Sequence, residues 1–208
     1  MNRWLLLVGL ALALPTGAAR SDSADPAAGM VAPDSVVRGR FVQERTLVGF
    51  AAPLRTEGHF VLIPARGLIW QAETPFKVRT VITPTALSQR IGDDETTRLT
   101  ADRIPALARL ADMLTGALSG NWQSLLHDFK VERSGSNTAW QVTLTPRDAV
   151  DATTLPFDSI SVRGGRLVDF IELHRPGGDS DRISFLDQTV GAAALDENEG
   201  RILDGQTK

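Results

Sequence analysis

Three histidines, His59, His127 and His174, are the side chains of this sequence best suited to proton transfer or metal ligation near neutral pH. They lie far apart, and none has the spacing of a zinc-binding H-E-x-x-H helix. The acidic runs at 92–95 and 196–199 do not space their oxygens as a calcium loop does, and no G-x-S-x-G segment occurs. We therefore expect a protein that is not an enzyme and that needs no cofactor or metal.

A regular alternation of apolar and polar side chains over residues 55–82 points to a different chemistry, the binding of apolar molecules. A period of two residues predicts strands with one buried face. Such a face is covered either by the protein's own core or by a ligand that comes and goes. One face would carry Phe60, Leu62, Leu68, Trp70, Val78, Thr80 and Ile82, and the other Glu57, His59, Gln71, Lys77 and Arg79.

The elements that position this face are strands on both sides of a helical segment. Strand patterns run from Val36 to about Ile91 and return near residue 129. Between them, apolar residues at steps of three and four predict a helix over 102–120, and a second short helix follows at 122–129. With about eleven strands in all, we predict an α+β fold in which a curved antiparallel sheet, or open barrel, is covered by helices.

The N-terminus has the layout of a secretory signal peptide. Arg3 precedes an apolar run at 4–14 that is too short to span a bilayer, and small residues follow at 17–19. We expect cleavage after Ala19. Because no cysteine follows the apolar run to carry a lipid, we expect a soluble protein in the periplasm of a Gram-negative cell.

The amino-acid composition excludes several classes of site and binding partner. The chain has no cysteine, and therefore no disulfide, thiolate metal site or cysteine nucleophile. The formal net charge of −3 becomes −4 once the signal with its single arginine is removed, which argues against nucleic-acid binding. We expect a monomer with a signal peptide at 1–19, a flexible leader at 20–35, one folded domain at 36–190 and a charged, loose tail at 191–208.

Residues 39–83 carry a further pattern. It consists of Phe41 and Gln43 in an F-x-Q motif, Gly58, the apolar strand at 60–63, Arg66, Trp70, Pro75 and the run at 81–83. In this combination the segment resembles the first half of the LolA family, the periplasmic outer-membrane lipoprotein carrier proteins. The later strands follow that family's order, so that the resemblance extends over about residues 36–190.

The resemblance implies an eleven-stranded half-open β-barrel whose concave apolar face is covered by a lid of two or three helices, with the acyl chains of a lipoprotein or another acyl lipid between them. It also implies an inner-membrane transporter as donor and an outer-membrane acceptor. In the family a basic residue just before the third strand holds the lid closed through hydrogen bonds, and Arg66 matches that position. Two departures, Gly67 where proline is usual and 27–34 in place of a long N-terminal helix, resemble divergent members linked to other acyl lipids.

The predicted function is therefore a periplasmic carrier that shields acyl chains in an apolar cavity and passes its cargo to an outer-membrane acceptor. Plain core packing is the competing interpretation for each residue of the cavity. A sensor or adaptor that grips a protein partner through the same concave sheet is the second hypothesis, and an acyl-transferring or hydrolysing enzyme is the third. The residues expected to line the cavity are Phe60, Leu62, Leu68, Trp70, Val78, Ile82, Leu107, Leu110, Leu114, Trp122, Trp140, Val142, Leu144, Ile160 and Phe170.

Overall fold

The computed structural model describes residues 31–64, 66–92, 94–100, 115–116, 118–119, 122–147, 157–192 and 195–205. Within these ranges the chain forms eleven strands, one short 3₁₀ helix and the α-helix α2, with further helical residues at 115–116 and 118–119. The elements are β1 (Ser35–Thr46), β2 (Leu54–Ile63), β3 (Gly67–Thr74), β4 (Val78–Ile82), β5 (Ala86–Ile91), β6 (Asp94–Thr100), η1 (Trp122–Leu125), β7 (Phe129–Gly135), β8 (Trp140–Pro146), β9 (Ser159–Gly164), β10 (Val168–His174), β11 (Ser180–Ala192) and α2 (Glu197–Asp204).

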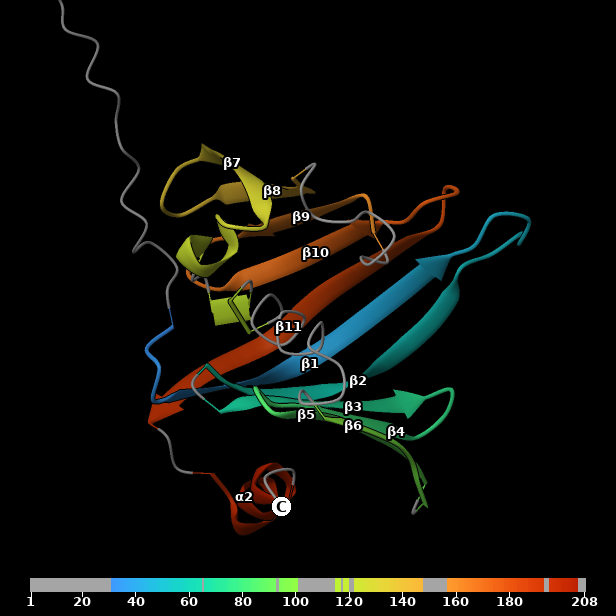
Figure 1. The fold of residues 1–208 in the computed structure, drawn as a ribbon, viewed down its shortest axis with the longest axis vertical. Helices are drawn as coiled ribbons and strands as arrows, with labels where there is room; N and C mark the ends of the chain where they lie inside the picture. The colour runs from blue at the N-terminus through green and yellow to red at the C-terminus, as the bar shows by residue number, and fades with distance from the viewer. Residues whose placement is uncertain are drawn as a thin grey trace, which may run out of the picture.

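All eleven strands belong to one antiparallel sheet in the order β6-β5-β4-β3-β2-β1-β11-β10-β9-β8-β7. Two runs of consecutive hairpins, β1 to β6 and β7 to β11, join where β1 pairs with β11 at the middle of the sheet. The sheet curves without closing, so that β6 and β7 are its two edges (Figure 1). This architecture confirms the predicted eleven-stranded half-open barrel.

The predicted helical cover is only partly visible in the described residues. Residues 115–116 and 118–119, near the end of the helix expected over 102–120, are helical. The short helix expected at 122–129 is limited to the 3₁₀ turn η1, followed by a turn at 126–128. Residues 101–114, with most of the predicted lid, lie outside the described ranges. In the part of the chain that the structure describes, no helix has both the length and the hydrophobicity to cross a membrane.

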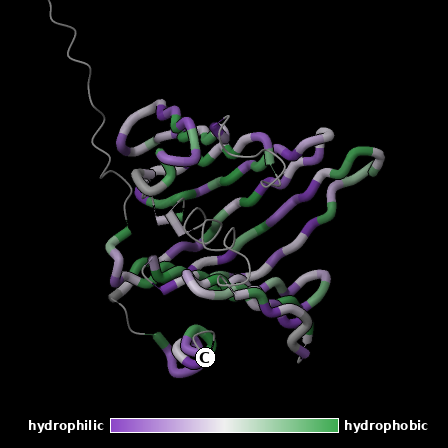
Figure 2. The backbone as a smooth tube through the Cα atoms, viewed as in Figure 1, coloured by the Kyte–Doolittle hydropathy of each residue, from purple (hydrophilic) through white to green (hydrophobic). Residues whose placement is uncertain are grey.

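Hydrophilic and hydrophobic residues alternate along many of the strands (Figure 2), and the two faces of the sheet carry different side chains. We define the concave face as the one that bears Phe41 and Phe60, and its large apolar cluster continues across both halves of the sheet. The opposite, convex face has a smaller apolar cluster over β1 to β4, where α2 packs. Over β7 to β10 the convex face is mostly polar. Among the described residues, only those of the concave face therefore form an apolar surface that spans the whole sheet.

Helix α2 begins at a well-formed cap. The Asp196 side chain accepts a hydrogen bond from the backbone N–H of Glu199, and the Glu199 side chain accepts one from the backbone N–H of Asp196. Within the tail that we expected to be loose, residues 197–204 therefore form an amphipathic α-helix with a capping box at its start and a buried Leu203.

Arginines from two strands and one turn hold α2 against the convex face. Arg38 of β1 donates two hydrogen bonds to the carboxylate of Glu199, at 2.8 and 2.5 Å. Near the other end of the helix, Arg98 of β6 donates a hydrogen bond to the carbonyl oxygen of Gly205 at 3.3 Å. A cation at this end also suits the helix dipole, whose C-terminus is partly negative. Arg66, just before β3, provides the third contact and is described with the site below.

We expect Leu203→Ala to lower the free energy of unfolding by about 2 to 4 kcal/mol, because it removes the buried anchor of α2 from the convex cluster. Exposed Arg201 on the same helix provides the control, and Arg201→Ala should change stability by less than about 0.5 kcal/mol. Urea unfolding followed by circular dichroism measures both. Equal effects of the two variants would mean that α2 is not anchored through Leu203.

Candidate functional site

The concave face brings together most of the residues predicted to line an apolar cavity. Trp70 and Val78 are only partly buried and pack against the same cluster. Leu107, Leu110 and Leu114 lie outside the described residues. The predicted residues that are buried in this one cluster are Phe60, Leu62, Leu68, Ile82, Trp122, Trp140, Val142, Leu144 and Ile160.

Phe170 is placed differently from the prediction. It pairs with Arg163 of β9, and the Arg163 guanidinium carbon lies 4.2 Å from the centre of its ring on the convex face. The cause is an irregularity in the β9–β10 pairing between Val168 and Phe170. Such a shift exchanges the faces of all later residues, so that Ile171 and not Phe170 enters the concave cluster.

Four aromatic rings form the centre of the concave face. Phe41 and Trp70 stack with their ring centres 3.8 Å apart, and Phe185 meets Phe60 edge to face at 5.2 Å. Gly58 is paired with Phe41 on one side and Ala72 on the other, which leaves room beside the phenyl ring for the indole. This explains why Phe41, Gly58 and Trp70 occur together in the sequence pattern.

We name the buried apolar cluster of the concave face the apolar floor. Sequence reasoning missed several of its members, notably Phe185, Phe129 and Phe157. Phe129 and Phe157 stack at 6.0 Å between ring centres, and both are buried. The signal for Phe185 was the alternation Asp181, Ile183, Phe185 along β11. The residues directly before Phe157 in the sequence show no alternation of apolar and polar side chains that could have assigned it to a face.

A charged cluster lies on the same face, toward the end of the sheet that carries the β1–β2, β3–β4 and β10–β11 turns, which we name the hairpin end. Its centre is Asp181, whose side chain is only 2% exposed. Arg45 Nε donates to Asp181 Oδ1 at 2.7 Å, and Arg175 Nε donates to Oδ2 at 2.8 Å. Gln43 Nε2 adds a hydrogen bond to Oδ1 at 2.8 Å. We name these four residues the Asp181 cluster.

The charge state of Asp181 follows from its surroundings. Burial by itself would raise the pKa of this carboxyl group, but the three hydrogen bonds donated to it outweigh burial and hold the pKa below the ordinary aspartate value. Asp181 is therefore ionised at neutral pH, between two partly exposed guanidinium groups. The alternation Phe41, Gln43, Arg45 in the sequence was the signal that could have placed two members of this cluster beside the aromatic floor.

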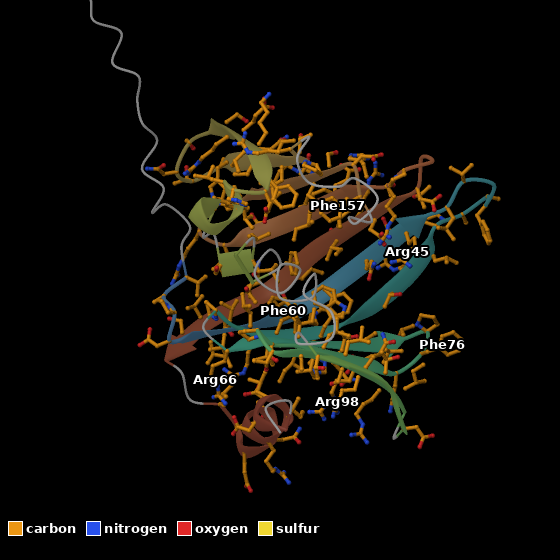
Figure 3. The ribbon with its side chains drawn as sticks, in the orientation of Figure 1. Arg45, Phe60, Arg66, Phe76, Arg98 and Phe157 are labelled. Atoms are coloured by element: carbon orange, nitrogen blue, oxygen red, sulfur yellow. The ribbon has the colours of Figure 1, made fainter. Side chains whose placement is uncertain are left out.

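Arg66, the predicted lid switch, lies in the turn between β2 and β3 at the other end of the sheet. Its terminal Nη2 donates a hydrogen bond to Asp204 Oδ1 of α2 at 2.6 Å (Figure 3 labels the arginine near the helix). Gly67 follows it with a positive φ of 140°, and a Cβ atom there would lie 2.2 Å from the carbonyl oxygen of Ile82. Glycine at this position therefore fits the backbone of this chain.

A separate hollow of about 590 Å³ lies at the β7–β8 and β9–β10 turns. Its wall includes Ser134, Gln141 and Arg163, which are cross-strand neighbours on the convex face. Apart from Trp140 and Phe170, no residue predicted for the acyl cavity contributes to it. The hollow is therefore distinct from the apolar floor.

A family model described as outer membrane lipoprotein carrier protein LolA-like matches residues 16–201. No curated protein sequence matches the chain.

Solved structures with a similar fold include a LolA superfamily protein from Nitrosomonas europaea, at 8% identity and a TM-score of 0.44, with 83% of this chain and 93% of that chain covered. A domain from Vibrio parahaemolyticus, named for outer membrane lipoprotein sorting, is 7% identical with a TM-score of 0.46 and coverages of 88% and 95%. Pseudomonas aeruginosa MucB, solved in complex with MucA, is 15% identical with a TM-score of 0.42; 80% of this chain matches 55% of that chain.

We expect Asp181→Asn to lower the free energy of unfolding at neutral pH by about 1 to 3 kcal/mol, because hydrogen bonds from charged donors to a buried carboxylate are weakened. A lowered pKa means that the stabilisation is present above the ordinary aspartate pKa of about 3.9 and disappears as the pH falls through the folded-state value. Wild type and variant should therefore converge in acid.

The control for this measurement is Asp187→Asn on the same strand, where the ion pair with Arg40 is exposed on both sides. It should change stability by less than about 1 kcal/mol at any pH. Urea unfolding across a pH series measures both variants. A gap between wild type and Asp181→Asn that persists unchanged in acid would contradict the assigned charge.

Proposed function

The chain belongs to the outer membrane lipoprotein carrier protein LolA-like family, and from this premise we propose that it is a periplasmic carrier that shields acyl chains on its concave face and passes them to an outer-membrane acceptor. The cargo is a lipoprotein or another acyl lipid, and an inner-membrane transporter is the donor. The carrier itself performs no catalysis in this proposal.

The observation that carries the proposal is the continuous apolar floor of the concave face, with four aromatic rings at its centre. Each CH₂ group of an acyl chain moved from water onto such a surface gains about 0.8 kcal/mol. Trp70 and Val78 are only partly buried in the cluster, so that apolar surface beyond the protein's own packing is available beside them. Family membership and this floor together favour an acyl ligand.

Release of the cargo requires that the free energy gained by burying its acyl chains be offset. A lid whose own contacts are lost on loading lowers the net affinity and makes transfer reversible without an energy source in the carrier. We propose that residues 103–127 form this lid and that Arg66 stabilises its closed state, as the family resemblance implies. The cargo would then displace the lid rather than fill a permanently open cavity.

A protein partner is the competing occupant of the same face. Large apolar side chains are unusually exposed at the hairpin end, where Phe50 is 63% and Phe76 73% exposed. Phe76 lies at the β3–β4 turn, away from the packed floor (Figure 3). Such side chains suit contact with another macromolecule. An adaptor that grips a protein is therefore the second candidate.

Binding of a pyrene-labelled fatty acid to delipidated protein tests the carrier proposal. We expect the wild type to bind it and Val78→Glu, on the concave face, to weaken binding by about ten-fold or more, because an unpaired carboxylate beside an acyl chain is costly. Val42→Glu makes the same change at a half-buried position on the convex face, and it should leave binding unchanged. If both variants lose affinity for the probe to the same extent, the concave face is not the binding site.

Native mass spectrometry of protein purified from its own cells separates the two candidates. Bound acyl lipid supports the carrier, whereas a stoichiometric co-purifying protein without lipid supports the adaptor. Failure of the wild type to bind any acyl probe would overturn the carrier proposal.

We expect Arg66→Leu to tighten binding of the fatty-acid probe by about ten-fold and to slow its release, because the closed lid would lose the one or two hydrogen bonds that this proposal assigns to Arg66, worth about 0.5 to 1.5 kcal/mol each. Asp204→Asn weakens the contact between Arg66 and α2 without changing the arginine, and it should leave binding and release as in the wild type. Fluorescence titration and stopped-flow transfer to lipid vesicles measure both. If Asp204→Asn reproduces the effect, Arg66 acts through α2 and not through the lid.

A further inference from the structure

The Asp181 cluster contains more positive charge than its buried carboxylate requires. One arginine would neutralise Asp181, yet Arg45 and Arg175 both contact it, from β1 and from the residue that follows β10. Their side chains remain 43% and 31% exposed, whereas Asp181 is 2% exposed. The cluster therefore presents a net charge of about +1 to the outside, with the negative charge inside.

The two guanidinium groups are also held in a defined orientation. Each uses its Nε on a different oxygen of the same carboxylate. In the part of the chain that the structure describes, their terminal amino groups donate no hydrogen bond. A planar guanidinium that is fixed through Nε leaves its outer amino groups ready for a second acceptor. Two such groups on one carboxylate form a preorganised pair of donors for an anion.

The position of this pair relates it to the apolar floor. Phe41, Gln43 and Arg45 occupy alternate positions of β1 on the concave face. On β11, Phe185 pairs with Phe41 and Asp181 pairs with Arg45. Four residues of a strand span ~13 Å. The two arginines thus lie toward the hairpin end, where Figure 3 labels Arg45. A short acyl segment can span the distance between them and the stacked rings of Phe41 and Trp70.

We propose that Arg45 and Arg175 form a binding site for the anionic head group of the acyl ligand, a carboxylate or a phosphate, while the acyl chain lies over the aromatic floor. This inference rests on the proposed carrier function and adds the chemical class of the cargo. Asp181 does not touch the head group, and it positions the two arginines. The head group would face the hairpin end, and the chain would extend from there toward Phe41 and Phe60.

A purely structural role is the competing explanation, because the same contacts tie β1 to the β10–β11 turn. It predicts that loss of the arginines reduces stability and impairs binding of every ligand to the same extent. An anion site predicts instead a loss that depends on the charge of the ligand. A charged probe and an uncharged probe with the same chain distinguish the two roles.

The test compares a pyrene-labelled fatty acid with its methyl ester, at a pH where the acid is ionised. Variant Arg45→Gln/Arg175→Gln/Asp181→Asn removes the three charges together, so that no unpaired carboxylate stays buried. We expect its affinity for the acid to fall by about ten-fold or more, with affinity for the ester unchanged. Arg182→Gln removes the neighbouring arginine on the convex face, which pairs with Glu172, and it should bind both probes as the wild type does.

The wild type supplies a measurement that needs no variant. The ester is the more apolar molecule, so that a cavity without an anion site would favour it. We expect the acid to bind more tightly than the ester, and this preference to decrease as salt is added. Preference for the ester, or equal loss of both probes in a triple variant that remains folded, would overturn the head-group site and leave the carrier proposal intact. If neither probe binds the wild type, the carrier proposal fails and the head-group site fails with it.

Discussion

Removal of the concave apolar face from water is the constraint on which the rest of the structure depends. Its cluster draws side chains from both halves of the sheet and includes the largest buried aromatic groups. Curvature brings these side chains toward one another, so that rings from β1, β2, β3 and β11 make contact. An open sheet cannot bury this face with strands alone, and any further cover must come from other segments or from a ligand.

The convex face meets the same requirement by different means in its two halves. Over β1 to β4 an apolar patch remains, and α2 covers it with Leu203 while arginines fix both ends of the helix. Over β7 to β10 the outward positions are largely polar and need no cover. The covering helix therefore has a structural role on one half only, and it leaves the concave face free for a separate function.

The sequence was sufficient for the strands and for most of the apolar floor, because a period of two residues assigns faces wherever pairing is regular. It failed at Phe170, where one irregular position in the strand pairing reversed the faces. It also failed at α2, because the charged composition of this segment suggested a loose tail although the sequence at 196–199 has the pattern of a helix capping box. The Asp181 cluster depends on contacts between segments that are 136 and 138 residues apart. No local pattern reports such contacts, although the alternation beyond Phe41 could have placed Gln43 and Arg45 on the same face as the aromatic rings.

The central pairing of β1 with β11 has a consequence for how the chain reaches this structure. Each half of the sheet is a series of local hairpins that can form early, but the seam between them joins the first described strand to the last one. Contacts of such high sequence separation are slow to form, because a long loop must close before they stabilise anything. A chain that emerges N-terminus first therefore keeps the seam edge of β1 unpaired until β11 appears. During that interval it is vulnerable to aggregation, and a chaperone that shields this edge would raise the yield of folded protein.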